Sequence, residues 1–141
     1  MKIFLDFDGV LRRESSPRSA LDPDCVRHFE EAVLSHPDAR VVISSTWRLA
    51  YRLDGLKKLF SNEAAARIEG VTPVIDDVED YQRHIEIQAY MNRDASRGIR
   101  WVAVDDDPDN FKPGAALILV DPAHGFDATC AVRLREWLAG T

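Results

Sequence analysis

Short apolar runs alternate with longer segments of helical periodicity along the whole chain. All but the first of these runs show little alternation between apolar and polar positions, which is typical of strands that are covered on both faces, as in a parallel sheet. We therefore predict five strands, which cover residues 2–7, 40–44, 71–75, 100–104 and 116–120.

The segments between these strands predict helices. Asp22 is expected at the N-cap of the first helix and Pro23 at its first helical position, and the pair His36-Pro37 is expected to end it. Apolar residues at helical spacing predict further helices over about residues 46–60, 62–69 and 82–96, and a last one that starts from Asp127.

This alternation of strands and helices predicts an α/β fold. Right-handed β–α–β crossovers would give a three-layer, Rossmann-like core, in which a five-stranded parallel sheet has helices on both faces. In such sheets ligands bind beyond the carboxyl ends of the strands. The residues that follow each strand are therefore the first place to look for a functional site.

Composition and charge limit the class of protein. The chain has 141 residues, which suits a single domain over 1–141, and 24 acidic against 18 basic side chains give a net charge of −6. This balance argues against non-specific coating of nucleic acid, although it leaves room for a local basic site. No apolar run approaches the roughly 18 residues of a membrane span.

The early residues and the cysteines narrow the picture further. Asp6 and Asp8 interrupt the early apolar run, so no signal peptide is expected and the predicted location is cytoplasmic. The spacing of Cys25 and Cys130 matches no zinc-binding motif, and two cysteines do not indicate a disulfide framework. The oligomeric state stays open.

Carboxylates stand at the ends of two predicted strands. Asp6 and Asp8 end the first strand, and Gly9 permits a sharp turn after them. Asp105 and Asp106 follow the fourth strand. Crowded carboxylates repel one another, and a hard divalent cation with oxygen ligands relieves that repulsion. The pattern therefore predicts a Mg²⁺ site at this edge of the sheet.

Hydroxyl groups and one cation complete the candidate site. Ser44, Ser45 and Thr46 lie where the second strand leads into a helix, whose first N–H groups favour an anion. Arg83, at the start of the fourth predicted helix, is the candidate cation for phosphoryl oxygens. A carboxylate-held metal beside a helix N-terminus and a cation is typical of phosphoryl transfer.

These elements resemble the four motifs of the haloacid dehalogenase (HAD) superfamily, in the right order and over nearly the whole chain. They are the stretch Asp6-x-Asp8-Gly9-Val10, the strand that ends in Ser44-Ser45, Arg83, and the pair Asp105-Asp106. A narrower resemblance is to the HAD domains of Swiss army knife RNA repair proteins. It is carried by residues 44–48, Arg83-x-x-Glu86-Ile87, the pair Asp105-Asp106, and Asp121-x-x-x-Gly125.

The resemblance implies a Mg²⁺-dependent phosphatase. Asp6 would be the nucleophile that becomes an aspartyl-phosphate, and Asp8 would protonate the leaving oxygen and later activate water. Asp105 would join Asp6 and the Asp8 backbone carbonyl around Mg²⁺, with Asp106 or Asp109 as a further acidic partner.

The other roles that the resemblance implies leave alternatives open. Ser45 would bind the phosphoryl group, with Ser44 as its rival. Arg83 stands where lysine is more common in the superfamily, and Lys57, Lys58 and Lys112 are the alternatives for this cation. Ser44, Thr46, Arg48 and Arg12 are candidate substrate-binding residues, although exposure to solvent is the simpler expectation for the two arginines. Trp47 is expected to pack in the core or along its helix rather than to stack on a base.

The chain has no room for the cap domain that many HAD enzymes carry, so an open site is expected. An open site suits the phosphate of a macromolecule, such as an RNA or DNA end. Two other functions stay open: a receiver-like phosphoacceptor with Asp76 at the end of its third strand, and a carboxylate–metal nuclease.

Overall fold

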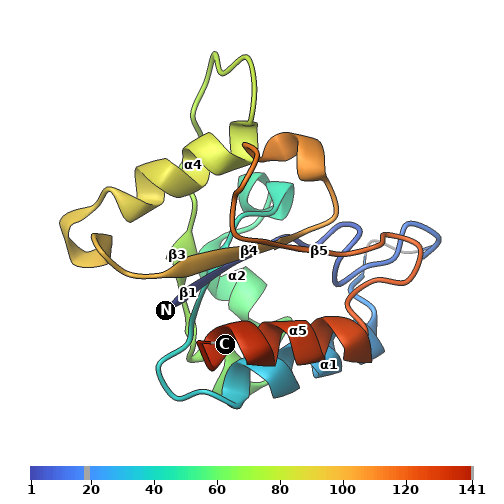
Figure 1. Cartoon of the computed structure of the whole chain (residues 1–141). Helices are drawn as coiled ribbons and strands as arrows, with labels where there is room; N and C mark the ends of the chain where they lie inside the picture. The colour runs from blue at the N-terminus through green and yellow to red at the C-terminus, as the bar shows by residue number, and fades with distance from the viewer. Residues whose placement is uncertain (18–19, 141) are drawn as a thin grey trace.

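The computed structural model describes residues 1–17 and 20–140, and its centre is a five-stranded parallel sheet (Figure 1). The strands lie in the order β3-β2-β1-β4-β5 and are β1 (Lys2–Leu5), β2 (Arg40–Ile43), β3 (Ile68–Val71), β4 (Trp101–Asp105) and β5 (Leu117–Leu119). The predicted α/β class and the predicted parallel sheet are confirmed.

Helices cover both faces of this sheet. The α-helices are α1 (Pro23–Leu34), α2 (Leu53–Lys57), α3 (Asn62–Ala65), α4 (Gln82–Met91) and α5 (Ala128–Leu138), and the short 3₁₀-helices are η1 (Thr46–Leu49), η2 (Asp94–Ser96) and η3 (Pro108–Asn110). Figure 1 shows α4 on one face of the sheet, with α1 and α5 side by side on the other. The described residues contain no inserted cap domain.

Alternate residues of the strands feed two separate cores. Ile3 and Leu5 of β1 belong to the larger core, which α1, α2, α3 and α5 cover. Phe4, between them, points into the smaller core under α4, where it makes an edge-to-face contact with Tyr90. Both faces of β1 are therefore apolar, as its central place in a covered parallel sheet requires.

The strand order places the site. In this order β1 is central and β4 is its neighbour on the side where the connections change direction. Such a switch point leaves a crevice beyond the carboxyl ends of the two strands, where ligands bind in open α/β sheets. Receiver domains have a flavodoxin-like order with β3 next to β1, so the observed order disfavours the receiver-like alternative.

Several predicted boundaries are wrong, and the helix predicted over 62–69, for example, ends at Ala65, before β3 begins at Ile68. The third strand lies at Ile68–Val71 rather than 71–75, because Pro73 has no N–H with which to extend the ladder. The helix predicted over 46–60 is two elements, since Arg52 has an extended backbone (φ −74°, ψ 158°) between η1 and α2. Helix α4 ends at Met91 rather than at 96.

The start of α1 shows a further difference. Pro23 is the first residue of α1 and Asp22 occupies its N-cap position, as predicted. The Asp22 carboxylate does not cap the helix, however. It accepts hydrogen bonds from the backbone N–H of Arg13 and the hydroxyl of Ser16 instead, and so fixes the loop after β1. Among the described residues, no helix is both long and apolar enough to cross a membrane.

Candidate active site

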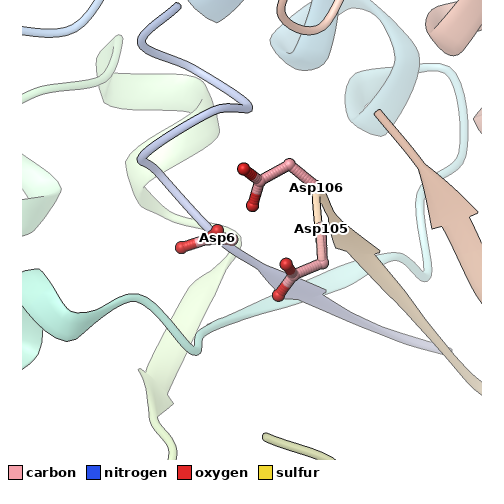
Figure 2. A group of neighbouring side chains, drawn as sticks. All are labelled: Asp6, Asp105 and Asp106. Atoms are coloured by element: carbon pink, nitrogen blue, oxygen red, sulfur yellow. The ribbon is translucent and has the colours of Figure 1, made fainter. Parts of the chain in front are cut away.

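Three carboxylates meet at the carboxyl ends of β1 and β4. Asp6 follows β1 directly, Asp105 is the last residue of β4, and Asp106 comes next (Figure 2). One oxygen from each lies within 4.8 Å of the other two. Asp6 and Asp105 are only 3% and 1% exposed, whereas Asp106 is half-buried. We call these three residues the carboxylate cluster.

Gly9 allows the loop after β1 to pass close to this cluster. Its φ of +79° lies in the left-handed region that glycine adopts at little cost. A Cβ atom at this position would overlap the Asp106 carboxylate. Both the backbone turn and the close approach of Asp106 therefore require glycine here.

Arg83 is the cation that the structure brings to the cluster. It is the second residue of α4, and its Nη1 lies 2.9 Å from Asp6 Oδ1 and 2.6 Å from Asp105 Oδ2. The same Asp6 oxygen accepts the backbone N–H of Phe7 at 2.8 Å. Asp105 Oδ1 accepts the N–H of Asp107 at 3.0 Å. These contacts hold both buried carboxylates in fixed orientations.

Burial and mutual repulsion set the electrostatics of the cluster. Burial, and next the charge of Asp105, raise the pKa of Asp6 to about 8, against the lowering effect of Arg83. Burial likewise raises the pKa of Asp105, again opposed by Arg83. One guanidinium among three carboxylates leaves an excess of negative charge that a divalent cation would offset.

The cluster therefore fits the metal that the sequence predicts. Its donors are all hard carboxylate oxygens, gathered within 4.8 Å of one another, and the absence of a side chain at Gly9 leaves room for the Asp106 carboxylate. Mg²⁺ prefers a few such carboxylates and keeps other positions for water or phosphate. Of the two alternatives for the further acidic partner, Asp106 joins the cluster, whereas exposed Asp109 is not one of its three members.

The predicted hydroxyl residues lie at the end of β2, next to β1. Ser45 is fully buried, and its Oγ accepts the N–H of Trp47 at 3.2 Å, so that it caps η1. Ser44 is also buried, and its N–H donates to the carbonyl of Leu5 at 2.9 Å. Thr46 is exposed. Both serines stay candidates for the phosphoryl-binding hydroxyl.

Asp8 stands apart from the carboxylate cluster and is half-exposed. The indole Nε1–H of Trp47 donates to both of its oxygens, at 3.2 Å each. Arg12 Nη1 lies 3.4 Å from Asp8 Oδ1, and Arg12 Nη2 also donates to the carbonyl of Ser16. The two expected catalytic carboxylates therefore have different surroundings: Asp6 faces Arg83, and Asp8 faces Trp47 and Arg12.

Arg48 differs from the expectation of a substrate-binding arginine. Its side chain is 5% exposed and pairs with Glu86, itself 6% exposed, at 3.0 Å. Its other guanidinium hydrogens bond the backbone carbonyls of Ser45, Thr72 and Pro73. The structure thus places Arg48 in a buried position, where it links the ends of β2 and β3 to helix α4.

Trp47 contributes to the site beyond the packing role that the sequence predicts. It does pack edge-to-face on buried Phe7, with ring centroids 5.4 Å apart. Its N–H nevertheless points at Asp8. The periodicity of apolar residues carries no signal for this contact, since it depends on the direction of one N–H bond.

The late Asp121-x-x-x-Gly125 stretch supports the loop that carries Asp8. Gly125 has a φ of +68°, and a Cβ there would approach Cys25 Sγ to 2.7 Å and the Val10 carbonyl to 3.1 Å. The next residue, Phe126, donates its N–H to that same carbonyl at 2.7 Å. This stretch therefore packs against the loop after β1 and holds its backbone in place.

Comparison with known proteins agrees with this geometry. The model of the family described as the HAD domain in Swiss Army Knife RNA repair proteins matches residues 2–131. Searches of curated proteins and of solved structures found no significant match. The match covers all five strands and every residue of the carboxylate cluster. On this evidence the chain belongs to the family of HAD domains found in Swiss Army Knife RNA repair proteins.

Proposed function

We propose that this protein is a Mg²⁺-dependent phosphatase, which hydrolyses a phosphomonoester through an aspartyl-phosphate on Asp6 and acts on phosphorylated RNA or DNA ends. Family membership supports hydrolase chemistry of the phosphatase type in an RNA repair setting. The observation that carries the proposal is the contact of Arg83 Nη1 with both Asp6 and Asp105 beside Asp106. This arrangement supplies a nucleophile, a cation and a metal site at one edge.

Asp6, Asp105 and Asp106, together with the Asp8 backbone carbonyl, would hold the metal. When bound, Mg²⁺ supplies the positive charge that offsets the cluster and polarises a phosphoryl oxygen. Arg83 adds a second positive charge next to the attacking carboxylate, which suits a transition state whose negative charge spreads over the phosphoryl oxygens. A serine hydroxyl at the end of β2 binds one of those oxygens.

Two displacements at phosphorus complete the reaction. In the first, a carboxylate oxygen of Asp6 attacks phosphorus and the bond from phosphorus to the leaving oxygen breaks, while Asp8 gives its proton to that oxygen. In the second, Asp8 takes a proton from water and the water oxygen attacks phosphorus. The bond between phosphorus and Asp6 then breaks, which releases inorganic phosphate and restores both aspartates.

The substrate class rests on the family and on the open site. No cap domain is present among the described residues, so a bulky polymer end can approach Asp6. A phosphorylated oligonucleotide is therefore expected to have a higher kcat/KM than a sugar phosphate. A higher kcat/KM for the sugar phosphate would contradict the proposed nucleic-acid substrate, but it would not contradict the proposed phosphatase activity.

The test is hydrolysis of p-nitrophenyl phosphate with Mg²⁺ and with EDTA, by the wild-type protein, Asp6→Asn and Asp109→Asn. We expect Mg²⁺-dependent activity that Asp6→Asn abolishes and that Asp109→Asn retains, because Asp109 is an exposed residue of the same loop outside the cluster. Equal activity of Asp6→Asn and wild type would refute the mechanism. Cleavage of internal phosphodiester bonds without phosphomonoester hydrolysis would favour the nuclease instead.

A further inference from the structure

A hollow of about 370 Å³ opens beside Asp8, and the carboxylate cluster and Arg83 are not among the residues that line it. It is lined by Asp8, Arg12, Thr46, Trp47, Ala50 and Tyr51. Asp8 is the proton donor to the leaving oxygen in the proposed reaction. The leaving group must therefore begin within reach of Asp8, and this hollow adjoins it.

Two aromatic rings form the apolar wall of the hollow. Trp47 and Tyr51 lie with ring centroids 5.8 Å apart and planes inclined by 37°. Trp47 is fixed by its contact with Phe7 and by its bond to Asp8. Tyr51 is 54% exposed, although a large aromatic side chain gains from burial. One anchored ring next to one exposed ring is a suitable surface for a further planar ring.

Apart from Ala50, the rest of the lining is polar. It comprises the Asp8 carboxylate, the Arg12 guanidinium and the exposed Thr46. An aliphatic or lipid-like group would leave these groups in contact with hydrocarbon, which is unfavourable. A group with one planar aromatic part and several hydroxyls meets both kinds of wall, and a nucleoside has this composition.

We propose that this hollow is the leaving-group subsite and that Tyr51 and Trp47 stack on the base of the phosphorylated terminal nucleotide. The proposal rests on the proposed function, because it takes Asp8 as the group that protonates the leaving oxygen. It makes Tyr51 a specificity-determining residue. Base–aromatic stacking tolerates every base, so the subsite selects nucleotides over other phosphate esters without reading sequence.

The experiment compares two nucleotides with ribose 5-phosphate, the sugar phosphate that corresponds to adenosine 5′-monophosphate without its base. Hydrolysis of adenosine 3′-monophosphate and adenosine 5′-monophosphate is measured against ribose 5-phosphate, all with Mg²⁺. We expect wild type to prefer at least one nucleotide, and Tyr51→Leu to reduce that preference in kcat/KM by about 10-fold, the size of a lost base stack. Leu49→Ala is the matched control. Leu49 is 62% exposed on the neighbouring η1 and lines a different hollow, so the preference should not change.

A binding measurement separates this proposal from the reaction itself. Calorimetric titration of Asp6→Asn with the two nucleotides and with ribose 5-phosphate should show tighter binding of at least one nucleotide, and Tyr51→Leu in the same background should remove the difference. Equal affinity for all three esters, or a nucleotide preference that Tyr51→Leu leaves intact, would overturn the subsite. If wild type cleaves no phosphomonoester, the proposed function fails, and the titration still decides whether a base stacks here.

Discussion

The indole N–H of Trp47 donates to both carboxylate oxygens of Asp8, at 3.2 Å from each. This contact joins η1, at the end of β2, to the loop after β1. Asp8 is half-exposed and lies on a short loop, so its orientation depends on such contacts rather than on close packing. The Trp47 ring is itself held against buried Phe7. Its N–H therefore has a fixed position, and this fixes the orientation of the Asp8 carboxylate.

Replacing Trp47 with phenylalanine should lower kcat without a matching rise in KM. The change removes the N–H and keeps an aromatic ring against Phe7 and Tyr51. Hydrogen bonds to charged groups contribute about 1.5–3 kcal/mol, so a loss of roughly 10-fold in kcat is expected. Steady-state kinetics with p-nitrophenyl phosphate measure it. If Trp47 acts through Asp8, the double variant Trp47→Phe/Asp8→Asn should be no slower than Asp8→Asn, and additive losses would contradict this role.

Mg²⁺ should stabilise the folded protein through the carboxylate cluster. A ligand that binds only the native state at about 100 times its Kd adds roughly 2.7 kcal/mol, which corresponds to a rise in Tm of several degrees. Thermal unfolding with and without Mg²⁺ should show this rise for wild type and for Asp109→Asn, but not for Asp105→Asn. The same rise in Asp105→Asn would place the metal elsewhere.

Arg48→Met should destabilise the fold while it leaves KM for a small phosphate ester unchanged. Removing one member of a buried ion pair leaves the other charge uncompensated, at a cost of about 3 kcal/mol, and Glu86 is nearly as buried as Arg48. Urea unfolding measures the loss. The double variant Arg48→Met/Glu86→Gln should recover part of it, since no charge then stays buried. A large rise in KM with an unchanged free energy of unfolding would instead indicate that Arg48 binds the substrate.

His84 should make the protein less stable as the pH falls below about 6.5. Its Nδ1 accepts the backbone N–H of Lys112 at 3.0 Å, so the ring must be neutral there. Burial, and next the charge of Lys112, lower the pKa of His84 below its ordinary value of 6.5. Below that pH the unfolded chain binds more protons than the native protein, so the free energy of unfolding decreases as the pH is lowered.

Urea unfolding at pH 7.5 and at pH 5.5 checks this prediction. His84→Gln keeps a hydrogen-bond acceptor but removes the titrating ring, and it should lose less stability than wild type between the two pH values. An equal loss in both proteins would assign the acid sensitivity to other groups.

The carboxylates and the fold follow from the sequence for a simple physical reason. The carboxyl ends of neighbouring parallel strands lie side by side, so the residues that follow these strands are close in space. Asp6 and Asp105 do lie together in this way. The apolar pattern does not give the bounds of the edge strand β3, because Glu69 and Gly70 interrupt it. The Glu69 carboxylate is held by Lys2 and by the Tyr90 hydroxyl, which are tertiary contacts between distant residues.

The segment after β2 shows a second limit. Leu49, Leu53 and Leu56 have helical spacing, yet the backbone extends at Arg52 and divides the segment. Because arginines are usually solvated, the sequence favours a surface position for Arg48, whereas in the structure it forms an ion pair with buried Glu86 on α4. Neither outcome has a local signal, since each depends on which element packs against this segment.

The two halves of the site come from opposite faces of the sheet. Arg83 is carried by α4 on one face, whereas Trp47 packs with the core on the other. In the proposed reaction, the phosphoryl end of a substrate would therefore meet one layer of the molecule and its leaving group another. Substitutions at Tyr51, which follows η1 and contacts neither Arg83 nor the carboxylate cluster in the described contacts, would then change which leaving groups bind while the groups that break the bond stay in place.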